Sequence, residues 1–180
     1  MNLENIIFKS FYFEDSPSEN LINSLLENRL YYEGRILKPW YENQTFKKSV
    51  FSIAYYEEKP IAMTAIDINT RDWTPFIESS IKIERKTFVF CGVGMAYTKR
   101  PFRKKNISSI LLHNLEKCFL ANLGSNRNFM VALDPHLFPI AIKNFSKINL
   151  LKINYSKLWY PGQRQENIKK KVYNNKFYYE

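Results

Sequence analysis

The chain has 180 residues, of which 45% are hydrophobic and 16% aromatic, and it carries a net charge of +10. This length suits one hydrophobic core, so we expect one domain over residues 1–180. The composition excludes the low-hydrophobicity class of disordered chains. No apolar run reaches the roughly 18–20 residues that cross a bilayer, and the first residues lack a signal-peptide pattern. We therefore expect a cytoplasmic protein with no membrane partner.

The positive charge lies in the second half of the chain. Residues 1–98 contain 11 basic and 13 acidic residues, a net charge of −2, whereas residues 99–180 contain 16 basic and 4 acidic residues, a net charge of +12. Such asymmetry favours an anionic partner, either a phosphorylated cofactor, a nucleic acid or an acidic protein surface. A solvated basic surface without a ligand is the alternative interpretation.

Cysteine and histidine are too sparse to predict a metal site. The two cysteines, Cys91 and Cys118, show no CxxC spacing, and the two histidines, His113 and His136, lie far from Cys91 in sequence. Zinc sites need three or four such ligands at close spacing. We expect reduced cysteines and no metal, and we interpret Cys91 as a buried strand residue rather than a nucleophile.

The first half of the sequence predicts a strand, a helix and a hairpin. Residues 6–13 are rich in β-branched and aromatic residues, which is typical of a strand. Ser16 and Glu19 have the spacing of a capping box, with Pro17 at the first position of the helix. A weaker helix is predicted over 36–46. Residues 50–56 and 61–68 are expected to form a hairpin, and residues 69–80 a loop or short helix.

The second half predicts alternating strands and helices. Strand residues at 81–98 are interrupted by Gly92 and Gly94, and a basic turn at 99–106 leads into a helix. A strand at 129–133, a helix opened by Pro139 and strands near 150–159 and 172–179 follow, with a turn at 161–162. The order predicts an α/β (α+β) fold. Two apolar helix faces are expected: Ile107, Ile110, Leu111, Leu115, Cys118 and Phe119 in the first helix, and Ile140, Ala141, Phe145 and Ile148 in the second.

Three segments resemble the GNAT acyltransferase superfamily. Residues 54–62 are similar to its early hairpin, and residues 102–112 to its acyl-CoA signature, an aromatic residue and Arg followed by x-x-Gly-x-Gly/Ala and an aliphatic helix. Residues 141–150 match the spacing of its "Ala-x-x-x-Tyr-x-Lys-hydrophobic-Gly-Phe" segment. With the flanking elements, the resemblance extends over nearly the whole chain.

The resemblance implies a fold, a reaction and a set of site residues. The fold would be a GNAT-like mixed, mainly antiparallel central sheet flanked by helices, whose central strands diverge near Tyr97 and Asp134. The pantetheine arm of acetyl-CoA, or of a related acyl-CoA, would lie in this gap while an amine attacks the thioester. A strand N–H near Ala96 to Thr98 would polarise the carbonyl. The implied cofactor-binding residues are Ala96, Thr98, Arg103, Lys104, Lys105, Asn106, Ile107, Ser108 and Phe145.

The basic turn also suits a pyrophosphate on physical grounds alone. The first backbone N–H groups of a helix lack intrahelical partners, and the helix dipole favours an anion there. Five of the seven residues from 99 to 105 are basic, which adds positive charge. The family's two small residues are replaced by Asn106, which tolerates positive φ and is a good N-cap, and by Ser108, whose hydroxyl could bind a phosphate oxygen.

The acid and base of the expected reaction are less defined. Phe145 stands where many family members have the tyrosine that protonates the leaving thiolate, and phenylalanine has no proton to give. Water, Tyr97 or Tyr155 could replace it, and packing in the core is the favoured interpretation of Phe145. Asp134 is our candidate base, with Glu84 and Glu78 as alternatives, although an ordinary exposed carboxylate is the favoured interpretation of each.

Three functions remain open from the sequence. The first is an N-acyltransferase for a small amine or a protein amine. The second is an acyltransferase that modifies DNA or RNA, suggested by the basic second half and the interleaved aromatic and Lys residues from 155 to 179. The third is a GNAT-like binding scaffold without catalysis, suggested by Asn106, Ser108 and Phe145.

Overall fold

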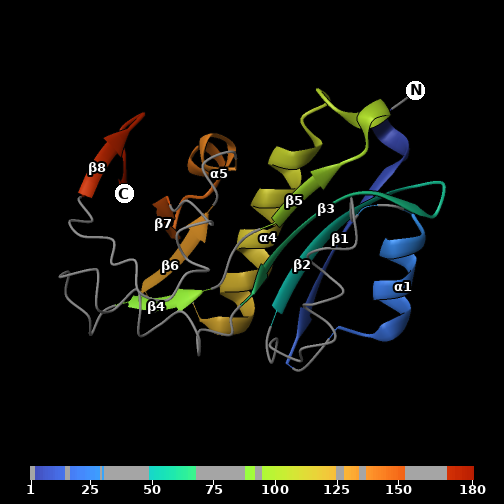
Figure 1. Ribbon diagram of the computed structural model, residues 1–180, viewed down its shortest axis with the longest axis horizontal. Helices are drawn as coiled ribbons and strands as arrows, with labels where there is room; N and C mark the ends of the chain where they lie inside the picture. Colours follow the sequence, from blue (N-terminus) through green and yellow to red (C-terminus); the bar gives the residue numbers. More distant parts are fainter. Residues whose placement is uncertain are drawn as a thin grey trace, which may run out of the picture.

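A computed structural model shows that the protein has a mixed α+β structure (Figure 1). The structure describes residues 3–14, 17–28, 30, 49–67, 88–91, 95–124, 128–133, 137–152 and 170–180. Within these residues it has a four-stranded antiparallel sheet, a second sheet of five short strands, and three α-helices. The predicted helix at 36–46, the predicted loop at 69–80 and the predicted turn at 161–162 lie outside the described residues.

The first sheet is antiparallel throughout. It consists of β1 (Ile6–Phe13), β2 (Ser49–Tyr56), β3 (Lys59–Asp67) and β5 (Met95–Thr98), in the order β1-β2-β3-β5. A short 3₁₀ turn, Leu3–Asn5, precedes β1. The predicted hairpin at 50–68 is confirmed as β2 and β3, joined by Glu57 and Glu58 with positive φ angles of 49° and 62°. Two positive φ angles are typical of a type I′ turn, whose twist matches that of the paired strands.

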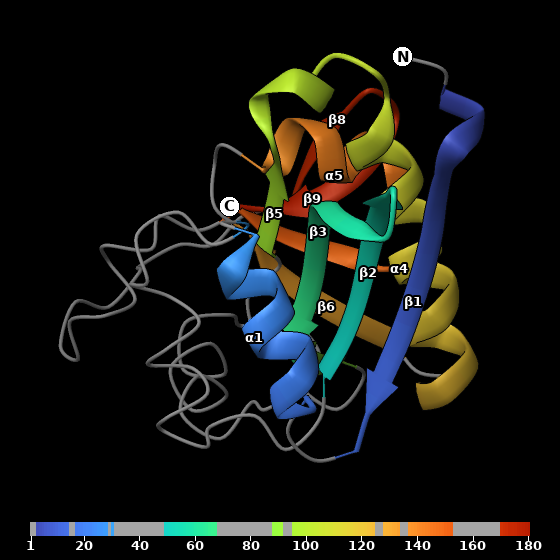
Figure 2. The same cartoon turned by 90° about the vertical axis from the view of Figure 1, so that its right-hand side faces the viewer.

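The two faces of the first sheet are covered by different helices. Helix α1 (Glu19–Glu27) packs through Leu25 with Phe51 and Met63, whereas helix α4 (Ile107–Leu123) packs through Ile107 and Leu111 with Ala54 and Ala62. Figure 2 shows α1 in front of this sheet and α4 behind it. Opposite faces of the same strands therefore pack against α1 and α4, and we call them the α1 face and the α4 face.

The start of α1 differs from the prediction. The helix begins at Glu19, and its cap is Ser18, whose Oγ accepts a hydrogen bond from the N–H of Leu21 at 3.4 Å. Pro17 therefore precedes the helix instead of opening it, and the capping box predicted from Ser16 and Glu19 is wrong. Ser18 has the same capping chemistry as Ser16 but lies directly before the first helical residue.

The second sheet is mainly parallel, unlike the first sheet and unlike the mixed, mainly antiparallel central sheet that the resemblance implies. Its strands are β4 (Phe88–Cys91), β6 (Asn128–Leu133), β7 (Asn149–Lys152), β8 (Lys170–Tyr173) and β9 (Lys176–Tyr179), in the order β4-β6-β7-β9-β8. Only β8 and β9 pair in antiparallel fashion. Helices α4 and α5 (Phe138–Asn144) return the chain so that successive strands run in the same direction.

Helix α4 connects the two halves of the molecule. It contacts β1, β2, β3 and β5 of the first sheet and also α5, and it lies centrally in Figure 1. Its predicted apolar face is confirmed at four positions and is wrong at Ile110, which is 38% exposed, while Cys118 is half-buried. The buried face of α4 instead comprises Ile107, Leu111, Leu112, Leu115, Glu116 and Phe119.

Glu116 is a buried carboxylate on this face, with 4% of its surface exposed. Its oxygens accept hydrogen bonds from the backbone N–H groups of Ser146, Lys147 and Ile148 at 2.7–3.1 Å and from the Ser146 hydroxyl at 3.0 Å. A buried carboxylate is tolerated only when hydrogen bonds replace its hydration. Glu116 therefore fastens the connection between α5 and β7 to the middle of α4.

Helix α5 is shorter than predicted. Pro139 lies in its first turn as expected, but the helix ends at Asn144, so Phe145 and Ile148 follow it. Phe145 is 3% exposed and belongs to a core cluster with Leu112, Leu115 and Val131. Phe145 and Ile148 are thus buried as predicted, but the prediction that they belong to the helix is wrong.

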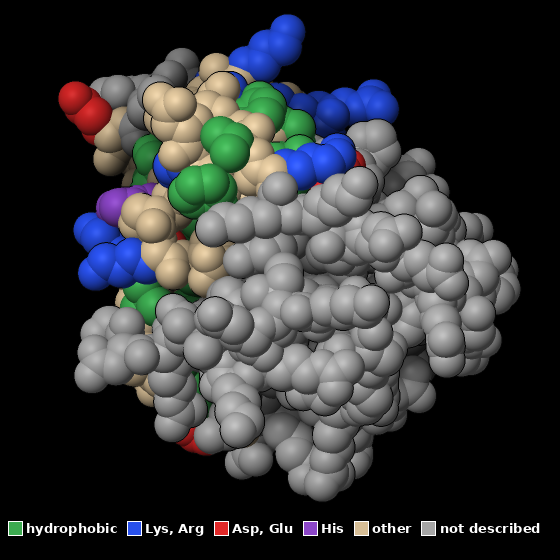
Figure 3. Space-filling view, turned by 90° about the vertical axis from the view of Figure 1, so that its left-hand side faces the viewer, with side chains coloured by type: hydrophobic (Ala, Val, Ile, Leu, Met, Phe, Trp, Pro, Cys, Tyr) green, Lys and Arg blue, Asp and Glu red, His purple; other side chains and the backbone are tan. Residues whose placement is uncertain are grey.

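The last two strands form a hairpin docked on α5. The segment predicted as one strand at 172–179 is β8 and β9, separated by Asn174 and Asn175 at φ angles of 46° and 62°. The Lys176 ammonium donates to the carbonyl of Phe145 at 3.0 Å, beyond the end of α5, where cations are favoured. Val172 and Phe177 are about 60% exposed. Figure 3 views the molecule from the left-hand side of Figure 1, where β8 lies, and shows hydrophobic side chains gathered in the upper part of that face.

Among the described residues, no helix has both the length and the apolar character needed to cross a bilayer. His, Cys, Asp and Glu side chains of the described residues form no group of three that could hold a metal ion.

We expect Glu116→Gln to lower the free energy of unfolding by about 1–3 kcal/mol, because the new amide NH₂ would face donor groups and leave them unpaired in the core. Chemical denaturation measures this loss. Glu19→Gln, which changes an exposed carboxylate on α1, is the matched control and should have little effect. An unchanged denaturation midpoint for Glu116→Gln would contradict the structural role of this carboxylate.

The Glu180 carboxylate should make the hairpin sensitive to acid. Hydrogen bonds from Lys152 at 2.6 Å and Lys171 at 2.8 Å hold the pKa of Glu180 at about 2, below its ordinary 4.5. Because the folded-state pKa is lowered, this stabilisation is complete above pH 4.5 and is lost as the pH falls toward 2. The pairs are partly exposed, so we expect less than about 1 kcal/mol. Amide resonances of residues 170–180 should report the transition, which Glu180→Gln should remove.

Candidate functional site

The candidate site lies where β5 ends and α4 begins. β5 pairs with β3, and the N–H of Lys99 continues this ladder by donating to the carbonyl of Ile61 at 3.0 Å. Because backbone groups alternate along a strand, the N–H groups of Ala96 and Thr98 point away from β3. The structure thus directs these two N–H groups toward the edge of β5 that lies nearer the second sheet.

β5 and the strands of the second sheet belong to different ladders. β4 pairs in parallel with β6 through residues 88–91 and 128–131, whereas β5, only a few residues later, pairs with β3 and with no other described strand. β6 continues to Leu133 and pairs there with β7. Among the described residues β5 thus shares no ladder with β6, and the expected divergence near Tyr97 stays a prediction. Asp134, the other landmark and the candidate base, lies outside the described residues.

The turn between β5 and α4 is closed by local hydrogen bonds. A 3₁₀ turn over Arg100–Phe102 is held by the N–H of Phe102 to the carbonyl of Lys99 at 2.9 Å. The guanidinium of Arg103 folds back, and its Nε donates to the carbonyl of Thr98 at 2.9 Å. The same guanidinium lies over the ring of Tyr97, 5.9 Å from its centroid. Arg103 therefore joins the turn to the end of β5.

Asn106 adopts the left-handed conformation, with φ 58° and ψ 11°. This is the conformation that glycine takes most readily, and asparagine is among the few other residues that visit it routinely. Asn106 is the N-cap residue of α4 and has positive φ, as expected, but its side chain makes no capping hydrogen bond. Lys104 also has positive φ, 62°, which makes the turn sharp on both sides of Lys105.

The first turn of α4 offers backbone donors. The first hydrogen bond of the helix runs from the N–H of Ile110 to the carbonyl of Asn106 at 3.2 Å, so the N–H groups of Ile107, Ser108 and Ser109 have no intrahelical acceptor. The Ser108 hydroxyl lies 3.1 Å from the Thr98 hydroxyl across the turn. The preceding turn carries exposed cationic residues: Arg100, Arg103 and Lys104.

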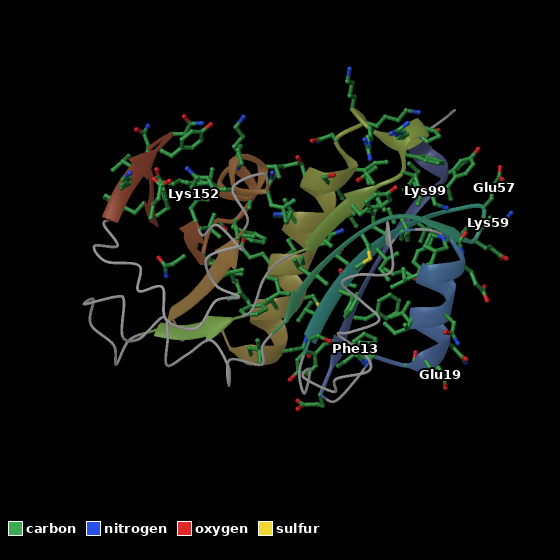
Figure 4. All side chains as sticks on the ribbon, viewed as in Figure 1. Phe13, Glu19, Glu57, Lys59, Lys99 and Lys152 are labelled. Carbon is green, nitrogen blue, oxygen red and sulfur yellow. The ribbon has the colours of Figure 1, made fainter. Side chains whose placement is uncertain are left out.

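Lys99 lies at the exit of β5 and is half-buried. Burial, and secondarily the positive charge of Lys59, lower the pKa of its ammonium group. Figure 4 shows Lys59 and Lys99 at the end of the first sheet that carries the β2–β3 turn. The cationic surface of the site therefore extends from the α4 turn onto the first sheet, a continuation that no local sequence pattern indicates.

The structure brings most of the predicted cofactor-binding residues together and separates one. Thr98, Arg103, Lys104, Lys105, Asn106, Ile107 and Ser108 surround the turn, and the backbone of Ala96 lies on β5 beside Tyr97. Phe145 is buried in the core cluster, which agrees with its packing interpretation. The alternative acid Tyr155 and the alternative bases Glu78 and Glu84 lie outside the described residues.

Comparison of the chain with protein-family models, with curated proteins and with solved structures found no match. The resemblance to the GNAT superfamily therefore rests on the sequence motifs alone.

We expect Asn106→Val to lower the free energy of unfolding by about 1–2 kcal/mol relative to Asn106→Gly, because a β-branched residue is strained at positive φ. Thermal and chemical denaturation of the two variants measure the difference. Equal stability of the two variants would show that the turn does not require the left-handed conformation at this position.

Proposed function

We propose that this protein is an acyl-CoA-dependent N-acyltransferase of the GNAT type, which transfers an acetyl or similar acyl group to an amine. The observation that carries the proposal is the separation of β5 from β6 directly before a left-handed turn at a helix N-terminus. An extended pantetheine arm fits beside a strand whose outer N–H groups are not used by another described strand, and a pyrophosphate fits the helix start.

Each part of the site has a role in this proposal. The N–H groups of Ile107 and Ser108 would bind pyrophosphate oxygens, with Arg103 and Lys104 supplying charge. The N–H groups of Ala96 and Thr98 would bind the arm and polarise the thioester carbonyl. The amine attacks this carbonyl, the C–S bond breaks, and the coenzyme leaves as a thiolate that takes up a proton. The protein contributes mainly by positioning the two reactants.

The proton donor that this proposal favours is Tyr97. It is the candidate acid on a described strand at the site, and its half-buried ring is held beneath Arg103. Phe145 has no proton to donate and packs in the core. The candidate base Asp134 would follow β6, whose last residue is Leu133. An amine proton could reach it directly or through water.

The described lysines of the hairpin do not favour the nucleic-acid alternative. The Lys171 ammonium pairs with Glu180, and the Lys176 ammonium donates to two backbone carbonyls, of Lys143 and Phe145. Lys171 and Lys176 are therefore engaged within the protein, as Arg103 is at the α4 turn, whereas Arg100 and Lys104 at that turn are exposed. The basic second half of the sequence serves, in part, to hold the hairpin in place.

Acetyl-CoA should raise the melting temperature of the protein, because a ligand that binds only the folded state stabilises it. At a concentration 100 times the Kd the gain is about 2.7 kcal/mol, or roughly 5–11 °C for a chain of this size. Ser108→Glu should abolish the shift while leaving the fold intact, since its carboxylate would occupy the phosphate position. His113→Glu, exposed on the same helix, is the matched control and should keep the shift. No shift with any short acyl-CoA near a millimolar would refute the proposed function.

A further inference from the structure

Strand β1 is the longest sheet edge among the described strands. It is the outermost strand of the first sheet and pairs with β2 over all of Ile6–Phe13, in one continuous register. The other described edge strands, β5, β4 and β8, have four residues each. Figure 2 shows β1 along the right-hand edge of the first sheet. No described strand pairs with the outer side of β1, which therefore presents a long row of backbone N–H and C=O groups.

β1 lacks the features that keep ordinary edge strands from pairing. Natural edges are short, bulged, interrupted by proline or guarded by charged side chains. β1 contains no proline and a single charged residue, Lys9, whose ammonium lies 5.6 Å from the ring centroid of Tyr55 on β2. This charge therefore lies over the neighbouring strand instead of beyond the edge. The edge strand β8, in contrast, begins with Lys170 and Lys171.

Apolar side chains line this edge on both faces of the sheet. Side chains alternate along a strand, so the even-numbered residues of β1 share the α4 face, where Phe8 packs with Ile107. The odd-numbered residues share the α1 face, where Phe13 packs with Leu25. Ile7 is 58% exposed. The aromatic residues of the strand are only half-buried: Phe8, Phe11, Tyr12 and Phe13. A strand paired with this edge would remove more of their apolar surface from water.

A second copy of β1 fits this edge in one register. Two identical antiparallel strands related by a two-fold axis bring like faces together, so the axis passes through a residue and not between two. An axis at Lys9 would set two lysines directly opposite each other, which is destabilising. An axis at Ser10 avoids this, and axes nearer either end pair fewer residues. The axis at Ser10 pairs residues 7–13 of the two copies: Phe8 with the partner's Tyr12, Ile7 with the partner's Phe13 and Lys9 with the partner's Phe11.

The pairing would supply as many hydrogen bonds as a stable interface contains. Two antiparallel strands of this length form about six to eight backbone hydrogen bonds, within the roughly 5–15 direct hydrogen bonds of typical protein interfaces. We propose that two copies of this chain form a symmetric dimer by antiparallel pairing of their β1 strands about Ser10, which joins the two first sheets into one. β5, which leads to the candidate site, is the opposite edge of each first sheet, so the inference is independent of the proposed function.

Sedimentation velocity over a series of protein concentrations tests the dimer. We expect a reversible equilibrium between the monomer and a species of twice the chain mass of 21.5 kDa. Ile7→Lys places a charge opposite the partner's Phe13 in both symmetry-related pairs and should weaken dimerisation at least tenfold. Val172→Lys makes the same change on the edge strand β8, at a residue that is 62% exposed, and is the matched control. It should leave the dimerisation constant unchanged.

Disulfide trapping under a mild oxidant tests the register. Ser10→Cys would bring two thiols directly opposite each other, with Cα atoms about 4.5–5.5 Å apart, a separation that a disulfide spans. Lys9→Cys would place its two Cα atoms on a diagonal, roughly 7–8 Å apart, which is too far. We expect Ser10→Cys to form the covalent dimer at least tenfold faster than Lys9→Cys. The unmodified chain, which carries Cys91 and Cys118, gives the background rate.

Several results would overturn the inference. These are a chain that stays monomeric near a millimolar, growth into assemblies larger than a dimer, unchanged dimerisation of Ile7→Lys, or loss of the dimer in Val172→Lys. Faster trapping of Lys9→Cys than of Ser10→Cys would overturn the register and with it the interface. Circular dichroism and the melting temperature establish that each variant is folded. If Ile7→Lys does not fold, the trapping experiment decides, because Ser10→Cys changes one side-chain atom only.

Discussion

The buried carboxylate of Glu116 is the interaction on which much of the second half of the fold depends. It orders residues 146–148 by accepting their N–H groups. This fixes the end of α5 and places Phe145 in the core, and the carbonyl of Phe145 in turn receives the Lys176 ammonium of the hairpin. The connection between α5 and β7 has few other ways to satisfy its backbone donors beside an apolar helix face. One side chain thus links α4, α5, β7 and β9.

Helix α4 connects the region held by Glu116 to the proposed site. Its middle is held by Glu116 and its first turn by the contact of Ser108 with Thr98, so the helix spans from the second sheet to the end of β5. The Asn144 amide also reaches the Ser109 hydroxyl at 3.4 Å, which ties the end of α5 to the same turn. The donors proposed for the phosphate therefore belong to a rigid helix and not to an isolated loop, which favours accurate positioning.

The sequence predicted elements well where their signals were local and poorly where they depended on distant contacts. The β2–β3 hairpin, the extent of α4 and the left-handed Asn106 follow from alternation, 3.6-residue periodicity and residue conformational preference. The parallel pairing of β6 and β7 has no local signal. Glu116 does have one, which the prediction of the apolar face did not use: it lies four residues after Leu112 and three before Phe119, in the centre of that face. A charge at such a position requires donors, which only the tertiary fold supplies.

The sharp turns among the described residues are built almost without glycine. Six described non-glycine residues have positive φ: Glu57, Glu58, Lys104, Asn106, Asn174 and Asn175. Left-handed backbone costs an ordinary residue about 1–2 kcal/mol, while glycine adds roughly 0.5–1 kcal/mol of unfolded-chain entropy. Compared with glycine, Glu or Lys at these positions therefore adds a small net strain to the native state, whereas Asn adds close to none. Thermostabilisation of this protein would therefore begin at its loops, with Glu57, Glu58 and Lys104, rather than in its interior.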